Sequence, residues 1–386
     1  MTKANYPVQK FQDIDTPFYY YDLDLLRATL AEIKAQSAKS NFDVHYAMKA
    51  NVSPSVLACI KEAGLGADCV SGGEVQAALD AGIPASKVVF AGVGKADWEI
   101  NLGLDNDIFC FNVESIPELE IINELAIAKG KTTQVALRIN PNVSAHTHHY
   151  ITTGLSENKF GINMSDLDKV TDLVLTLSNI KLIGIHFHIG SQITDMSSFQ
   201  ALSVRINEIQ EHFENRNVRL EVINVGGGLG INYEHPNHFP IPEFDAYFKI
   251  FREHLELRSH QTLHFELGRA VVAQCGSLIS RVLYIKEGTS KKFAILDAGF
   301  TELIRPALYQ AYHRIENLSS NLAEEVYDVV GPICESSDSF AKDYSMNATK
   351  RGDIIALRSA GAYGEIMASQ YNLRKLPKAY TSDELK

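Results

Sequence analysis

A lysine stands at the end of a strand-like run, where strands of this kind usually end in an apolar or turn residue. The run is Val44 to Ala47, and the lysine is Lys49. An amine at the mouth of a strand is partly desolvated, which lowers its pKa and allows it to attack an aldehyde and form a Schiff base. The alternative is a surface lysine whose stem lies along the sheet. The spacing alone leaves both interpretations open.

Polar residues and glycines also end most of the other strand-like runs of this part of the chain. They are Asp68 and Ser71, Arg138 and Asn140, His188, Gly226 to Gly228, and Glu266 with Arg269. In a closed barrel of parallel strands, active sites lie at the carboxyl ends of the strands. We therefore expect these residues to gather at one site with Lys49.

The glycine run at 226–228 and the carboxylate of Glu266 each have a possible role in binding a ligand. Backbone N–H groups at Gly226, Gly227 and Gly228 could approach a phosphate closely. A glycine run is also compatible with a simple turn, and this one matches neither a Walker nor a dinucleotide spacing. Glu266 could pair with a protonated ring nitrogen and keep an electron sink charged, or it could form a structural ion pair with Arg269.

His186 and His188 are two residues apart, so on a strand their side chains point to the same side, into the barrel. His188 lies nearer the mouth and is the better candidate to stack on a flat ring. His186 fits a hydrogen-bonded interior histidine. No histidines or cysteines show the spacing of a zinc site, so we expect no metal.

Further candidates follow the glutamate in the sequence. Cys334 and Glu335 lie in a polar turn, where a thiol facing the site could hand a proton to a carbanion, although a lone cysteine is usually buried packing. The segment from Arg305 to Tyr309 and Tyr363 add polar groups, and the alternative for these is ordinary surface and turn residues.

The elements that must position these residues alternate regularly. A helix capped by Asp24 is followed by eight strand-like runs with helical patterns between them: 43–48, 66–71, 87–91, 108–113, 133–139, 180–189, 218–225 and 262–266. This alternation predicts a (β/α)₈ TIM-like barrel over residues 24–268. The one long irregular segment, 141–161, carries His146, His148 and His149.

After Arg269 the pattern changes to β-branched runs at 271–286, 293–297, 325–330 and 353–358. We expect a second, mainly β domain, a sandwich or barrel of residues 269–386. It also takes in residues 1–23 with their strand at 18–21.

Composition restricts the class of protein. The 386 residues are 45% apolar and 22% charged, as in ordinary globular proteins, and no apolar run is long enough to span a membrane. The net charge of −11 opposes nucleic-acid binding. The start of the chain lacks the apolar region of a signal peptide, and the five cysteines are scattered. We therefore expect a cytoplasmic protein with free thiols that binds neither nucleic acid nor membranes.

Five motifs together resemble those of one family, in its order: 46–51, 186–192, 226–230, 305–309 and 334–336. The chain is similar to the pyridoxal-phosphate decarboxylases of the alanine racemase and ornithine decarboxylase fold, and within them to the diaminopimelate decarboxylase family. The resemblance covers nearly the whole chain. One departure is Glu266-Leu267-Gly268-Arg269, where the family usually has proline in place of Leu267. This departure affects only the rigidity of the local turn.

The resemblance implies that Lys49 carries pyridoxal 5'-phosphate as a Schiff base and that Cys334 is the proton donor. The cofactor-binding residues that it implies are Lys49, Asp68, Arg138, His188, Ser191, Gly226, Gly227, Gly228, Glu266, Leu267, Gly268, Arg269 and Tyr363. The implied substrate-binding residues are Arg269, Arg305, Tyr309, Glu335 and Tyr363. In the family the cysteine reaches the partner subunit's site, so a homodimer with shared active sites is implied.

The expected reaction is decarboxylation of meso-2,6-diaminoheptanedioate to L-lysine and carbon dioxide, the last step of lysine biosynthesis. Other enzymes on the same scaffold are alternatives, namely an ornithine or arginine decarboxylase or an amino-acid racemase. Arg305 and Glu335 favour a substrate whose far end has both a carboxylate and an ammonium group. Two further alternatives are a non-catalytic cofactor carrier, which in this fold group usually lacks the second domain, and an aldolase that uses Lys49 without pyridoxal.

Overall fold

The computed structural model describes residues 6–143 and 159–386, which divide into two compact units. The barrel unit comprises residues Leu30–Gly230 and Glu243–Gly268. The sheet unit comprises the residues up to Thr29, residues 231–242 and the residues from Arg269 onward. Relative to the domains expected from the sequence, residues 24–29 and 231–242 lie with the sheet unit. Most of the irregular segment 141–161, with its three histidines, lies outside the described residues.

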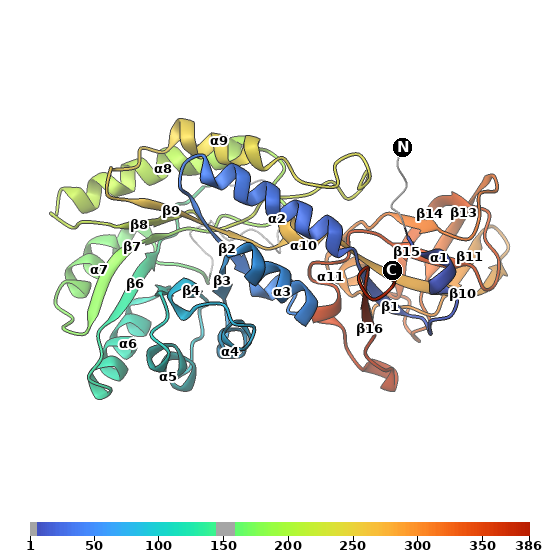
Figure 1. The fold of residues 1–386 in the computed structure, drawn as a ribbon, viewed down its shortest axis with the longest axis horizontal. Coiled ribbons are helices and arrows are strands. Elements are labelled where there is room, and N and C mark those ends of the chain that lie inside the picture. Colours follow the sequence, from blue (N-terminus) through green and yellow to red (C-terminus); the bar gives the residue numbers. More distant parts are fainter. Residues whose placement is uncertain (1–5, 144–158) are drawn as a thin grey trace. The chain divides into compact units, whose positions relative to one another are not determined.

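Eight parallel strands form the closed barrel that the sequence predicts, and β9 pairs with β2 to complete the ring (Figure 1). Buried apolar residues fill the strands, as expected where helices cover a parallel sheet. The strands are β2 (Asp43–Ala47), β3 (Gly66–Cys69), β4 (Val88–Phe90), β5 (Cys110–Val113), β6 (Thr133–Arg138), β7 (Ile180–His186), β8 (Val222–Asn224) and β9 (Thr262–Leu267).

Helices with one apolar face surround these strands (Figure 1). On α8 and α9, apolar residues spaced three or four positions apart are buried, and the rings of Phe199 and Tyr247 meet edge to face with centroids 4.8 Å apart. The helices that alternate with the strands are α3 (Pro54–Ala63), α4 (Gly72–Asp80), α5 (Asp97–Asp105), α6 (Ile116–Ala128), α7 (Leu167–Val174), α8 (Ser197–Glu214) and α9 (Phe244–His254), and α2 (Leu23–Ala38) precedes β2.

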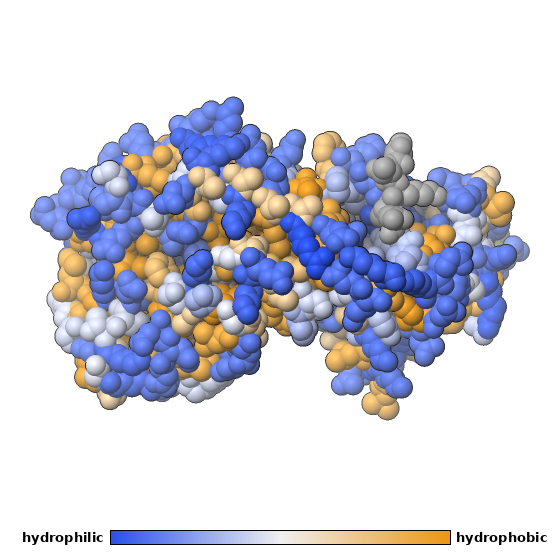
Figure 2. All heavy atoms as spheres, in the orientation of Figure 1, coloured by the Kyte–Doolittle hydropathy of each residue, from blue (hydrophilic) through white to orange (hydrophobic). Residues whose placement is uncertain are grey.

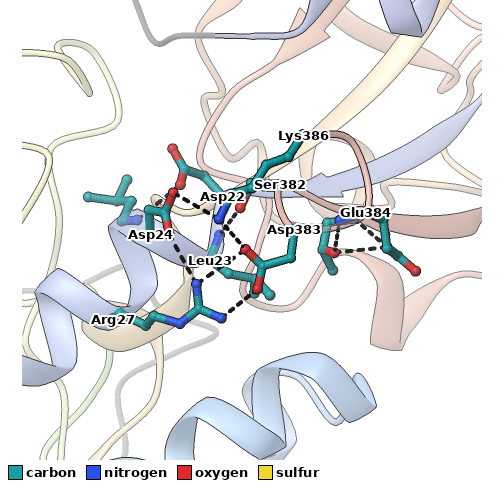
Figure 3. Close-up of polar contacts among 10 residues, drawn as sticks. Asp22, Leu23, Asp24, Arg27, Ser382, Asp383, Glu384 and Lys386 are labelled. Carbon is teal, nitrogen blue, oxygen red and sulfur yellow. Dashed lines mark hydrogen bonds and ion pairs between the residues drawn. The ribbon is translucent and has the colours of Figure 1, made fainter.

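The start of α2 differs from the prediction. Asp22, and not Asp24, caps the helix, because its Oδ1 accepts a hydrogen bond from the Leu25 N–H at 3.0 Å. The N–H of Leu23 donates to Ser382 Oγ at 3.0 Å, so a residue distant in sequence supplies a second cap (Figure 3). Arg27, also on α2, forms an ion pair with Asp383, the residue after Ser382, at 2.5 Å (Figure 3).

Two histidines on neighbouring strands of the barrel, His45 of β2 and His264 of β9, lie close together. His45 Nε2 and His264 Nδ1 are 2.9 Å apart, and Thr262 Oγ1 lies 2.9 Å from His264 Nε2. His45 Nδ1 lies 3.1 Å from the carbonyl oxygen of Lys87. Burial lowers the pKa of each histidine to about 4, so both rings are neutral at ordinary pH.

The sheet unit is built on an eight-stranded sheet in the order β12-β15-β10-β11-β13-β14, in which β1 pairs with β10 and β16. The predicted strand at 271–286 is wrong at its start, because Arg269–Val272 form the short helix α10 and β10 begins at Gly276. The strands are β1 (Phe18–Tyr21), β10 (Gly276–Glu287), β11 (Lys292–Leu296), β12 (Ile315–Asn317), β13 (Glu324–Val330), β14 (Ser339–Asn347), β15 (Ile354–Leu357) and β16 (Lys378–Thr381). The remaining short helices are α1 (Val8–Phe11) and α11 (Arg305–Tyr309).

Candidate active site

Lys49 lies where the sequence predicts, in a single 3₁₀ turn (Met48–Ala50) directly after β2. Tyr46 holds this turn in place by donating its hydroxyl to the carbonyl oxygen of Asn51 at 2.8 Å. The Asn51 side chain in turn accepts from the Ser53 N–H at 2.8 Å. The lysine is partly exposed at the carboxyl ends of the strands, and its charge lowers the pKa values of the neighbouring Glu266 and His188.

Glu266, on β9, is held by three donors from three other strands. Its Oε1 accepts from Asn112 Nδ2 at 3.0 Å and from Asn224 Nδ2 at 2.8 Å, and its Oε2 lies 2.9 Å from His186 Nε2. Burial would raise the pKa of this carboxyl, but His186, His188 and Lys49 together hold it well below the ordinary value. The site therefore contains a buried, fixed and ionised carboxylate.

The two asparagines were not predicted from the sequence. Each is a single polar residue within an apolar strand run, Phe111-Asn112-Val113 and Ile223-Asn224-Val225, and this interruption was the available signal. Asn224 Oδ1 also accepts from the Gly226 N–H at 2.9 Å, which fixes the orientation of its amide.

The pKa of Asp68, at the end of β3, is shifted in the opposite direction to that of Glu266. Burial and the charge of Glu266 raise its pKa well above the ordinary value, because two buried carboxylates cannot both ionise at low cost. The side chain is buried, and within residues 6–143 and 159–386 its Oδ1 has no hydrogen-bond partner. A buried polar atom in this condition is suited to receive a polar group from a ligand.

The glycine run after β8 passes very close to its neighbours. A Cβ at Gly227 would lie 1.9 Å from the carbonyl oxygen of Glu266, and a Cβ at Gly226 would lie 2.2 Å from that of Phe187. Gly228 has a φ of +109°, which side chains rarely allow. Only glycine therefore fits, and the run leaves a concave backbone surface beside the carboxylate.

The acceptors of the glycine N–H groups bear on the expected phosphate contact. The N–H of Gly226 donates to Asn224, and the N–H of Gly227 donates to His188 Nδ1 at 3.4 Å. Of the three glycine N–H groups, only that of Gly228 lacks an acceptor within the described part of the chain. The first two glycines allow the backbone to pass close to neighbouring strands, and the N–H of Gly228 is the one that can contact an anion.

His188 follows the end of β7 and presents a neutral ring. Burial and the charges of Lys49 and Arg138 hold its pKa well below the ordinary value. Arg138, at the end of β6, forms a buried ion pair with Glu114 at 2.7 Å. Its position is as predicted, and this ion pair was not anticipated.

The remaining predicted residues of the barrel unit lie beside these groups in sequence. Ser191 is in the loop after β7, which is tied to the glycine run by a hydrogen bond from the Ile193 N–H to the Gly228 carbonyl oxygen at 2.9 Å. Leu267 is the buried last residue of β9, and the buried Gly268 follows it.

In the sheet unit, Arg269 and Arg305 are both buried and converge on Tyr233. The Arg269 guanidinium also lies over the ring of Tyr363, 5.0 Å from the centroid. Tyr309, at the end of α11, is half-buried and raises the pKa of Arg269 together with the other two tyrosines. Sequence reasoning missed Tyr233, which follows the glycine run by five residues.

Cys334 and Glu335 lie in an exposed turn of the sheet unit. The buried Asp338 supports this turn by accepting from the N–H groups of Ile333 and Phe300, each at 2.7 Å. Glu335 Oε1 accepts from the Tyr371 hydroxyl at 2.6 Å. The cysteine is thus on the surface and is not buried packing.

A lysine and a fixed carboxylate at the carboxyl ends of a (β/α)₈ barrel, with a glycine run beside them, are the arrangement of a pyridoxal-dependent enzyme of the barrel class. The family model for the pyridoxal-dependent decarboxylase, pyridoxal binding domain, matches residues 25–273. Within the described residues, no group of three His, Cys, Asp or Glu residues could hold a metal ion.

Known proteins similar to this chain narrow the class. The diaminopimelate decarboxylase of Bacteroides thetaiotaomicron is 65% identical over 384 residues, covering 99% of this chain and 100% of that protein. That of Zymomonas mobilis is 42% identical, covering 94% of this chain and 86% of that protein. The crystal structure of diaminopimelate decarboxylase from Helicobacter pylori complexed with L-lysine superposes with a TM-score of 0.91 at 38% identity, covering 97% of this chain and 93% of that one.

The chain belongs to the diaminopimelate decarboxylase family of pyridoxal-dependent decarboxylases. The predicted family, enzyme class and cofactor are therefore confirmed. The residues present fit pyridoxal 5'-phosphate: a lysine for its aldehyde, an ionised carboxylate for its ring nitrogen, an Asp68 Oδ1 without a hydrogen-bond partner among the described residues, and a concave glycine surface that side chains would fill.

Proposed function

We propose that the protein decarboxylates meso-2,6-diaminoheptanedioate to L-lysine and carbon dioxide with pyridoxal 5'-phosphate. Its relatives, at up to 65% identity over the full chain, support this reaction. The structural observation that carries the proposal is the ionised Glu266, which three donors hold in the barrel beside Lys49.

The cofactor, when bound, supplies an aldehyde and a protonated ring that accepts electrons. Lys49 would hold the cofactor through its aldehyde, and Glu266, whose own pKa is held low, would hold the proton on the ring nitrogen. His188, a neutral imidazole, would help hold the ring without repelling its charge. The other proposed cofactor contacts are Asp68, Arg138, Ser191, Gly226, Gly227, Gly228, Leu267, Gly268, Arg269 and Tyr363.

For the substrate, Arg269 and Arg305 bind the carboxylate of the non-reacting end, since a guanidinium grips a carboxylate through two parallel donors. Glu335 binds the ammonium group at that end, and Tyr309 and Tyr363 contribute further contacts. Holding this end orients the reacting carbon and excludes shorter amino acids. The thiol of Cys334 donates a proton to that carbon after carbon dioxide leaves.

We propose that the protein acts as a homodimer in the cytoplasm, with Cys334 and Glu335 serving the partner subunit's site. Tyr371, whose hydroxyl bonds Glu335 of this turn, is followed in the sequence by two exposed apolar side chains, those of Leu373 and Leu376. Figure 2 shows hydrophobic surface on a projecting part of the sheet unit. Leu373 is 97% exposed and lies near the exposed Tyr371 and Leu376 in the sequence, and a group of exposed apolar side chains is a common feature of protein–protein contacts. Light scattering should give twice the chain mass, and Leu373→Asp should shift it toward the monomer.

The other reactions considered for this scaffold are not favoured. A lysine/ornithine decarboxylase from Vibrio vulnificus superposes with a TM-score of 0.83 at 22% identity, and this likeness shows only the fold.

Within the described residues, no helix has the length and apolar character needed to cross a membrane.

Assaying L-lysine and carbon dioxide from meso-diaminoheptanedioate, with and without added cofactor, tests the proposal. We expect turnover that depends on the cofactor, is lost in Lys49→Ala and is absent with L-ornithine or L-arginine. Preferential turnover of ornithine or arginine would overturn the proposed substrate. Equal activity in Lys49→Ala would overturn the assigned role of the lysine.

A further inference from the structure

Tyr233 lies between two buried arginines of the sheet unit. Its hydroxyl oxygen accepts from Arg269 Nη1 at 2.6 Å and from Arg305 Nη1 at 3.1 Å. Both guanidinium groups also lie near its ring, with Cζ of Arg305 at 5.3 Å and Cζ of Arg269 at 6.0 Å from the centroid. One phenol thus contacts both cations through its oxygen and its π system.

The surroundings leave positive charge that a ligand can neutralise. Arg305 is 6% exposed, and within residues 6–143 and 159–386 no carboxylate forms an ion pair with it. Its Nη1 also donates to His313 Nε2 at 3.0 Å, while His313 Nδ1 donates to the Arg358 carbonyl oxygen at 2.9 Å. The partners of this guanidinium are therefore neutral, and a buried cation of this kind favours an incoming anion.

The phenol is more than a packing residue in this setting. Burial would raise its pKa, but the charges of Arg269 and Arg305 outweigh burial and lower the pKa below the ordinary value. The two guanidinium groups therefore stabilise negative charge at its oxygen. It offers both guanidinium groups one shared acceptor, which limits their separation and directs them to a common point.

We propose that Tyr233 is a positioning residue that sets the spacing and direction of Arg269 and Arg305, and thereby selects substrates whose non-reacting end carries a carboxylate. This inference rests on the proposed function, in which the two arginines bind that carboxylate. L-lysine retains this end of the substrate, whereas 1,5-diaminopentane lacks the carboxylate and should not depend on Tyr233.

The test compares wild type, Tyr233→Phe and a matched control, Tyr247→Phe. Tyr233→Phe keeps the ring and removes only the hydroxyl. Tyr247 is also fully buried, but its hydroxyl has no hydrogen-bond partner among the described residues. Calorimetry gives the Kd of L-lysine and of 1,5-diaminopentane for the cofactor-loaded proteins, and steady-state kinetics gives KM and kcat.

In Tyr233→Phe we expect the Kd of L-lysine and the KM of meso-diaminoheptanedioate to rise about tenfold or more, as for the loss of a hydrogen bond to a charged group. We expect kcat to stay within about twofold, because the hydroxyl does not contact the reacting atoms. The Kd of 1,5-diaminopentane should not change. Tyr247→Phe should match wild type in every measurement.

A second variant separates positioning from packing. Arg305→Lys keeps the charge but loses the planar fork of donors, so it should also weaken L-lysine binding. If Tyr233 acts through Arg305, the double variant should be little weaker than Arg305→Lys alone, whereas independent effects would multiply.

Three results would overturn the inference: unchanged affinity for L-lysine in folded Tyr233→Phe, a fall in kcat with unchanged KM, or fully multiplicative effects in the double variant. Thermal unfolding and cofactor absorption establish that each variant is folded and loaded. Failure of wild type to turn over meso-diaminoheptanedioate would count against the proposed function, while the L-lysine affinities would still decide the role of Tyr233.

Discussion

Glu266 is the residue whose protonation state matters most, and its neighbours determine that state. A buried carboxyl alone would be protonated, because burial raises its pKa. His186, His188 and Lys49 reverse this effect, and the amide donors of Asn112 and Asn224 fix the carboxylate in place. Burial and the charge of Glu266 raise the pKa of Asp68. The two acids of one site are therefore held in opposite states by the charges around them.

We predict that Asn112→Ala lowers kcat about tenfold, because Glu266 loses a hydrogen bond to its charged form and its pKa rises. The affinity for the cofactor, measured by fluorescence titration, should also fall. Asn106→Ala is the control, since Asn106 is exposed and, in the part of the chain that the structure describes, its side-chain amide bonds only the carbonyl oxygen of Leu102. Unchanged kcat and cofactor affinity in Asn112→Ala would show that two donors are enough.

We also predict that Cys334→Ala reduces turnover at least about tenfold, because proton donation by a side chain commonly contributes a factor of about a hundred or more. Cofactor absorption should not change, because Cys334 lies on the exposed turn of the sheet unit. Cys59→Ala, which alters a buried thiol on α3, should leave the rate per folded enzyme unchanged. Turnover at the wild-type rate in Cys334→Ala would remove its proposed role.

The sequence predicted residues whose chemistry is visible in their type, such as Lys49, Glu266 and the glycines. It did not predict residues whose role depends on a neighbour. Asn112 is an ordinary polar residue until the barrel closes and brings it to 3.0 Å from a carboxylate 154 positions away. Tyr233 likewise gains its meaning only from two arginines that converge on it.

At the scale of elements, the barrel strands were predictable because apolar runs alternate with amphipathic helices. The strands of the sheet unit were less so. Residues 339–347 form β14 although exposed charged residues interrupt the run, and residues 315–317 and 378–381 form strands too short to give a period. Pairing with neighbours stabilises these strands more than their own propensity does.

The cap of α2 yields a prediction at this scale. Asp22→Ala should lower the free energy of unfolding by about 1 kcal/mol, because the first turn loses the acceptor for the Leu25 N–H. Ser382→Ala should have a smaller effect of the same sign, since it removes the acceptor for the Leu23 N–H (Figure 3). Asp24→Ala is the control, because Asp24 is exposed and, among the described residues, its carboxylate pairs with Arg27 at 3.0 Å and accepts from no backbone N–H. Urea denaturation followed by circular dichroism measures all three, and equal effects in Asp22→Ala and Asp24→Ala would contradict the assignment of the cap.

For the whole molecule, the buried histidines predict how stability depends on pH. Burial lowers the pKa values of His45 and His264 to about 4 and, with Arg305, that of His313 to about 3. The unfolded chain takes up these protons near pH 6.5, whereas the folded protein does so only near pH 4. Their contribution to stability is therefore complete above about pH 6.5 and is lost as the pH falls toward 4.

We predict that these three histidines lower the melting temperature between pH 7 and pH 4.5, each contributing on the order of 3 kcal/mol over its full range, whereas Asp68, whose pKa is raised, contributes in the opposite direction. Glu266, whose pKa is held low, loses its contribution only at lower pH and does not account for this fall. His45→Gln can still bond Lys87 or His264 but takes up no proton, so its melting temperature should vary less with pH than that of wild type. The exposed His260→Gln should keep the wild-type slope. If His45→Gln and wild type lost stability equally with acid, protonation of the unfolded chain at His45 could not be the cause.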